Sequence, residues 1–80
     1  MNSENSENPE NLQKALETRC TDIKVFVSSL DDAYRISFFK TKNDKVVFDV
    51  MLFFKYKDIK GSPDEYIYNY TTKKYGMFLW

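Results

Sequence analysis

Few residues in this chain are of the types that carry out enzyme chemistry. The sequence contains no histidine, so the commonest general base and the commonest metal ligand of proteins are both missing. Its one cysteine, Cys20, falls on the apolar stripe near the end of an expected helix. A reactive thiolate favours a helix N-terminus or a basic neighbour, so we expect Cys20 to be a buried structural residue. One cysteine with scattered carboxylates does not form a recognisable zinc site either.

Two pairs of adjacent acidic residues are the remaining candidates for chemistry. Paired carboxylates such as Asp31-Asp32 and Asp64-Glu65 can act as acid and base or bind calcium. Nothing around either pair completes a calcium loop or a glycosidase pair, and aspartate is a preferred turn residue. Neither glycine belongs to a phosphate-binding motif. We therefore expect a non-enzymatic protein with no cofactor, no bound metal and no small-molecule substrate.

Lysine residues near aromatic side chains leave one other kind of binding open. Proteins that bind single-stranded nucleic acid stack bases on aromatic residues of a sheet and contact the phosphates with lysine or arginine. The formal net charge of zero makes this the alternative hypothesis rather than the leading one. The lysines that would contact phosphates are Lys40, Lys55, Lys57, Lys73 and Lys74.

An N-terminal helix is predicted over residues 9–20, after a disordered acidic tail at residues 1–8. Asn8 can cap the helix, and Pro9 suits the first helical position, where a missing N–H costs nothing. So short a helix is marginal in isolation and must pack against the rest of the domain. Its apolar stripe, with one member every four residues, is Leu12, Leu16 and Cys20.

Apolar and polar residues then alternate, which predicts three antiparallel strands between residues 23 and 56. Asp31-Asp32 and Asn43-Asp44 supply the two turns. The alternation places one strongly apolar set on a single face of the sheet. That set is Ile23, Val25, Val27, Tyr34, Ile36, Phe38, Phe48, Val50, Leu52 and Phe54.

The register of these strands follows from keeping the apolar set on one face, because a slip by one residue would expose all of it. A three-residue loop over 43–45 pairs Phe38 with Val50, whereas a two-residue turn would mix the faces. The same reasoning places Val27 opposite Tyr34 in the first hairpin.

Beyond a loop at residues 57–64, the sequence predicts a strand over 65–71 and a final short strand over 75–80. The expected fold class is α+β, with the N-terminal helix packed on a four- to five-stranded antiparallel β-meander. Residues 9–80 form a single domain. The predicted strand over 65–71 carries three tyrosines on one face, Tyr66, Tyr68 and Tyr70.

The second face of the predicted sheet is more apolar than a solvent-facing surface should be. One short helix can cover only one face, so a contiguous apolar patch is expected on the other, as at an interaction site. Aromatic residues and methionine are enriched at protein interfaces. The expected interface residues are Phe26, Phe39, Met51, Phe53, Tyr66, Tyr68, Tyr70 and Trp80.

These patterns predict a small protein-interaction module that occupies a surface of a larger protein or of a second copy of itself. It would act as an inhibitor, an adaptor or an accessory subunit, of the kind that phages and mobile elements encode. The longest apolar run, residues 50–54, is far too short to span a membrane. The polar N-terminus does not resemble a signal peptide, and a lone cysteine is typical of a reducing compartment, so a cytoplasmic protein is expected.

Overall fold

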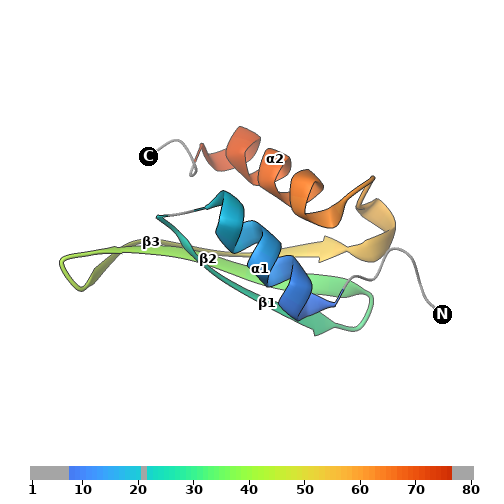
Figure 1. The fold of residues 1–80 in the computed structure, drawn as a ribbon, viewed down its shortest axis with the longest axis horizontal. Coiled ribbons are helices and arrows are strands. Elements are labelled where there is room, and N and C mark those ends of the chain that lie inside the picture. Colours follow the sequence, from blue (N-terminus) through green and yellow to red (C-terminus); the bar gives the residue numbers. More distant parts are fainter. Residues whose placement is uncertain (1–7, 21, 77–80) are drawn as a thin grey trace.

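The computed structural model describes residues 8–20 and 22–76, which form one antiparallel sheet and two helices (Figure 1). The elements along the chain are α1 (Pro9–Arg19), β1 (Lys24–Leu30), β2 (Ala33–Lys42), β3 (Lys45–Lys55), the short 3-10 helix η1 (Tyr56–Asp58) and α2 (Pro63–Tyr75). The strands lie in the order β1-β2-β3, and both helices lie on the same side of the sheet. The α+β class is confirmed, but the described residues form three strands rather than four or five.

Helix α1 begins and packs as its sequence predicts. The Oδ1 atom of Asn8 accepts a hydrogen bond from the backbone N–H of Glu10 at 2.7 Å, which satisfies one of the free donors of the first turn. The predicted apolar stripe of α1 is buried. The helix ends at Arg19, one residue before its predicted end, and most of the predicted tail lies outside the described residues.

Helix α1 also contacts the outer edge of β1 at Val27. The backbone N–H of Val27 donates a hydrogen bond to Oε1 of Gln13 at 3.0 Å. Because this N–H is bonded to a helix side chain, it points away from β2. An outward N–H on an edge strand is a template for pairing with another chain, and here a side chain of the same molecule occupies it.

The pairing of β2 with β3 is confirmed, although the turn that produces it differs from the prediction. Phe38 lies opposite Val50, as expected. The turn has two residues, Asn43 and Asp44, with φ values of 54° and 65°. Positive φ at both positions is the geometry of a type I′ hairpin turn. A β-bulge then inserts Val47 as one extra residue, which restores the register that a two-residue turn alone would have lost.

The pairing of β1 with β2 is shifted by two residues from the prediction. Val27 lies opposite Ile36 rather than Tyr34. The reason is that Asp31 and Asp32 alone form the turn, with Asp31 at a φ of 56°. Leu30 therefore pairs directly with Ala33. A shift by two residues keeps every side chain on its predicted face.

The prediction of a strand over residues 65–71 is wrong, because this segment forms the middle of α2. Ile67 and Thr71, four residues apart, are fully buried on the inner side of the helix. The hydroxyl of Thr71 donates to the carbonyl oxygen of Ile67 at 2.6 Å. Gly76 ends the helix in the left-handed region at a φ of 64°. Of the final strand predicted over 75–80, Tyr75 belongs to α2 and Gly76 is its C-cap. Residues 77–80 lie outside the described residues.

The core lies between the sheet and the two helices. The apolar face predicted for the sheet is confirmed, since all of its members are buried or packed against the core. Helix α2 adds Ile67, and the segment before it adds Ile59. The fully buried large side chains at its centre are Leu12, Leu16, Val25, Tyr34, Ile36, Phe38 and Ile67.

Candidate interaction surface

The face of the sheet opposite α1 and α2 carries large apolar side chains, and we call it the open face. Phe26 and Phe53 are each 57% exposed, and Met51 is 52% exposed. The ring of Phe39 is half-buried because it stacks on Phe26, with ring centroids 5.7 Å apart and an interplanar angle of 16°. Four of the predicted interface residues therefore come together on one surface.

The strand register makes this apolar surface continuous. Phe26, Ser37 and Met51 lie in one row across the three strands. Phe39 lies in the next row on one side, and Phe53 lies in the next row on the other. Side chains in adjacent rows of one face are within reach of each other when they are aromatic or long. The open face thus presents a single patch rather than separate exposed residues.

Charged residues surround the patch and are mostly basic. Lys24 and Asp49 lie on either side of Phe39 in its row. Arg35, next to Phe53, donates a hydrogen bond from Nε to the hydroxyl of Ser28 at 3.2 Å. Together with Lys55, the open face carries three cations against one carboxylate. Its rim therefore attracts acidic groups.

The tyrosines that were predicted to share the interface lie elsewhere. Tyr66 and Tyr70 extend from α2 and meet the ring of Phe54 edge-on, with centroids 6.4 Å and 5.2 Å away. The guanidinium of Arg19 lies 5.5 Å from the ring centroid of Tyr68. All three belong to the helical layer, away from the open face. The fourth predicted member of this group, Trp80, lies outside the described residues.

The lysines of the nucleic-acid hypothesis are distributed over several elements. Lys40 lies on β2, Lys55 at the end of β3, Lys57 in η1, and Lys73 and Lys74 in the last turn of α2. Lys74 donates a hydrogen bond to the hydroxyl of Tyr70 at 3.4 Å, which raises the pKa of this lysine. Only the last two of the five are neighbours on one element, so the structure does not gather them into one strip.

Two open grooves lie beside α2, and the sequence reasoning missed both because it predicted a strand there. The first, with a volume of about 460 Å³, runs along the helix from Lys60, before it, to Lys73 in its last turn. The second, about 340 Å³, lies at the end of β3. Tyr66 and Tyr70 line both grooves. The remaining lining residues of the second groove are Phe53, Phe54, Lys55 and Asp58.

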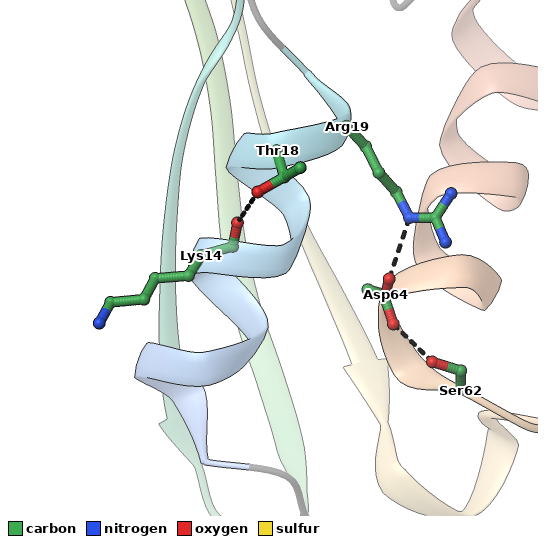
Figure 2. A network of polar contacts seen from close by, with 5 residues as sticks. All are labelled: Lys14, Thr18, Arg19, Ser62 and Asp64. Atoms are coloured by element: carbon green, nitrogen blue, oxygen red, sulfur yellow. Dashed lines mark hydrogen bonds and ion pairs between the residues drawn. The ribbon is translucent and has the colours of Figure 1, made fainter.

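An ion pair fixes the start of α2 against the end of α1 (Figure 2). Nε of Arg19 donates to Oδ2 of Asp64 at 2.9 Å, and the hydroxyl of Ser62 donates to the other oxygen of the same carboxylate. The hydrogen bond from Ser62, followed by that from Arg19, lowers the pKa of Asp64. Asp64 also lies in the first turn of α2, where a negative charge complements the helix dipole.

Cys20, the one thiol, is buried as predicted. It lies at the C-terminal cap of α1 and is a free cysteine. Removal from water raises its pKa to about 12, because the thiolate is disfavoured there, and the positive charge of Arg19 offsets only part of this effect. A thiol with so high a pKa remains protonated at neutral pH and is a poor nucleophile.

The raised pKa of Cys20 predicts a loss of stability in alkaline solution. The pKa of the folded thiol is about 12, whereas the thiol of the unfolded chain ionises near the ordinary cysteine pKa of 9.0. Above pH 9 the unfolded state is therefore favoured by up to about 1.4 kcal/mol per pH unit. Urea denaturation should be measured from pH 7 to pH 11 for the wild type and for a Cys20→Ala variant. Above pH 9 the free energy of unfolding of the wild type should fall more steeply than that of the variant, by up to about 1.4 kcal/mol per pH unit. Parallel pH profiles of the two proteins would contradict a buried thiol.

Within residues 8–20 and 22–76, no cluster of three or more cysteine, aspartate or glutamate side chains could hold a metal ion. None of the described helices is long and apolar enough to cross a membrane. Comparison of the chain with protein-family models, with curated proteins and with solved structures finds no match.

Proposed function

We propose that this protein is a small, non-enzymatic interaction module that binds a larger protein through the open face of its sheet. The observation that carries this proposal is the exposure of Phe26, Met51 and Phe53 side by side on that face. Single exposed apolar residues are normal on any protein. A continuous apolar patch with a polar rim is typical of an interaction site.

The composition of the open face indicates the chemistry of its partner. Phenylalanine and methionine are enriched at protein interfaces, where a few such side chains carry most of the binding energy. The basic rim, with Lys24, Arg35 and Lys55 against Asp49, complements a partner whose apolar surface is bordered by carboxylates. Small-molecule sites are concave, whereas this surface is the outer side of a sheet, which suits a protein.

Such a protein acts by covering a surface of its partner, as an inhibitor, an adaptor or an accessory subunit. Binding of this kind requires no catalytic group, in agreement with the chain's lack of histidine. We propose the cytoplasm as its compartment, because Cys20 is a lone cysteine.

The proposal predicts that a charge placed within the apolar patch of the open face abolishes partner binding without unfolding the protein. Phe26→Asp introduces a carboxylate at a side chain that is 57% exposed, so the core is not disturbed. The partner can be found by affinity capture from the native host and then purified for titration against each variant. We expect Phe26→Asp to weaken binding by about 100-fold or more, as at an interface hot spot.

Tyr75→Asp is the matched control, because it replaces an exposed aromatic residue by the same carboxylate on α2, in the other layer. It should bind the purified partner as tightly as the wild type does. Equal affinity of all three proteins would show that binding does not use the open face. Unfolding of Phe26→Asp, seen by circular dichroism, would show that Phe26 is part of the core.

Binding of single-stranded nucleic acid remains the second candidate. Its support is the first groove along α2, where Lys60 and Lys73 lie with Tyr66 and Tyr70. The distribution of the other lysines over β2, β3 and η1 ranks it below protein binding. Oligonucleotide affinity that falls steeply with salt would favour this candidate over the first.

A further inference from the structure

The outer edge of β3 forms one of the two margins of the described sheet. β3 is a terminal strand of the sheet, eleven residues long. The other terminal strand, β1, has its outward N–H at Val27 bonded to Gln13 of α1. A long, apolar edge strand pairs readily with another strand unless something blocks it. The last seven residues of β3 read Asp49-Val50-Met51-Leu52-Phe53-Phe54-Lys55 and contain no proline or glycine.

The direction of the backbone groups along β3 follows from the hydrogen bond of Val27. Its N–H points away from β2, so Val27 and Ile36 form a pair without mutual hydrogen bonds. Along an antiparallel strand the N–H and C=O groups of successive residues point to opposite sides. The backbone groups of Ile36 therefore point toward β3, and those of Leu52, which lies opposite, point back toward β2. The odd-numbered residues from 49 to 55 therefore direct their N–H and C=O groups outward, away from the sheet.

We infer that a second copy of this chain pairs with β3, antiparallel and centred on Leu52, so that two sheets join into one of six strands. In this register the outward-facing residues of one copy meet outward-facing residues of the other. Asp49 lies opposite Lys55 of the second copy, and Met51 lies opposite Phe53. Two-fold symmetry repeats each pair, so both copies gain the same contacts. The segment is thus complementary to itself in charge and in apolar character.

Neighbouring registers lack this complementarity. Backbone directions allow only shifts by two residues, since a shift by one would pair outward with inward groups. One such shift places Asp49 opposite Phe53 and Lys55 opposite Val47. The opposite shift places Lys55 opposite Met51. Each of these leaves Lys55 facing an apolar residue, so charge selects the register centred on Leu52.

The side of β3 that faces the helices also leaves room for the second copy. Val50 and Leu52 point toward the core but are only half-buried in the single chain. In the paired sheet Leu52 meets Leu52 of the second copy, and Val50 lies opposite Phe54. The open groove of about 340 Å³ lies at this end of β3 and is lined by Phe54, Tyr66 and Tyr70. It provides space for the Val50 side chain of the second copy.

The test is a pair of charge reversals measured by analytical ultracentrifugation of the full chain. The wild type should be dimeric at about 100 μM, where a Kd of about 1 μM gives nearly complete association. Asp49→Lys places two lysines opposite each other at both ends of the paired segment, and Lys55→Asp places two carboxylates there. Each single variant should raise the dimer Kd by about 30-fold or more, because like charges meet at two positions. An equimolar mixture of the two variants should dimerise again, since each lysine then meets a carboxylate.

Lys24→Asp is the matched control, because it reverses an exposed charge on β1, at the far side of the sheet. It should leave the dimer unchanged. A monomeric wild type at this concentration would overturn the proposal, as would single reversals without effect. Dissociation by Lys24→Asp as strong as that by Lys55→Asp would also overturn it, since association would then involve the open face and not the edge.

The register can be tested by disulfide formation between exposed positions. Met51→Cys and Phe53→Cys lie opposite each other in the proposed pair and should cross-link rapidly when the two variants are mixed and oxidised. Either variant alone should cross-link at least about 10-fold more slowly, because its cysteines are then diagonal neighbours at about 7–8 Å. Equal rates in the mixture and in the single variants would contradict the register centred on Leu52. These outcomes do not depend on Phe26, so they are independent of the test of partner binding.

Discussion

Replacement of Phe38 by alanine should destabilise the protein by about 3–5 kcal/mol, the usual cost of removing a buried aromatic ring from a core. The side chain of Phe38 is fully buried in the central strand, between Val25 and Val50 of the neighbouring strands. A domain of this length has a free energy of unfolding of about 4–12 kcal/mol. The loss should therefore move the midpoint of urea denaturation to a much lower concentration, or leave the variant partly unfolded in water.

Phe39→Ala provides the comparison, because the next residue of the same strand points to the open face and is half-buried against Phe26. This substitution removes one stacked ring pair and part of a ring's burial, so a loss of about 1 kcal/mol is expected. Similar losses for Phe38→Ala and Phe39→Ala would mean that both faces of the sheet are equally covered. That result would remove the basis for an exposed binding surface.

Replacement of Ile67 by alanine should cost about 2–5 kcal/mol, because this fully buried side chain is the main apolar contact between α2 and the core. Chemical denaturation monitored by circular dichroism would measure the change. Asn69→Ala should change stability by less than about 0.5 kcal/mol, because Asn69 is exposed on the outer side of the helix.

The comparison of Ile67 with Asn69 distinguishes a helix from a strand in this segment. In a strand the two residues would share one face, and both substitutions would act on the same environment. In the helix it is Thr71, four residues from Ile67, that shares the buried side. A large loss for Asn69→Ala together with a small one for Ile67→Ala would contradict the position of α2.

Within the described residues from 8 to 56, the elements could be predicted largely from the sequence, because the local signals there agree with the packing. Asn8 and Pro9 mark the start of α1, and the alternation of apolar residues assigns the side chains of β1, β2 and residues 48–55 of β3 to their faces. The details of the turns could not be predicted. A β-bulge at Val47 and a two-residue turn at Asn43-Asp44 give the same pairing as a plain three-residue loop, so the hydrophobic pattern alone cannot separate them.

Helix α2 was missed although its boundaries are marked in the sequence. Pro63 follows a serine, as Pro9 follows an asparagine, and Gly76 stands directly after the last turn. The tyrosines at 66, 68 and 70 imitate the alternation of a strand, and tyrosine has a high strand propensity. Packing favours the helix over the strand, because Ile67 and Thr71 are buried together, and buried side chains four residues apart match the period of a helix.

The candidate interaction surface could be predicted in part for the same reason. Phe26, Phe39, Met51 and Phe53 lie on strands whose periodicity is clear, so their common face followed directly. The prediction that Tyr66, Tyr68 and Tyr70 share this surface is wrong, because they lie on the helix α2 and not on a strand of the sheet. The grooves beside α2 could not be predicted, since they arise where a helix meets the end of β3.

The hydrogen bond from Val27 to Gln13 limits how far association between copies of this chain can proceed. A sheet with two free margins can add molecules at both sides and grow into a fibre. In this molecule the Gln13 side chain of α1 occupies the outward N–H of Val27, so a strand added to β1 could not bond at that position. The hydrogen bond that satisfies Val27 therefore disfavours the addition of another copy at β1 and opposes growth of the sheet into a fibre.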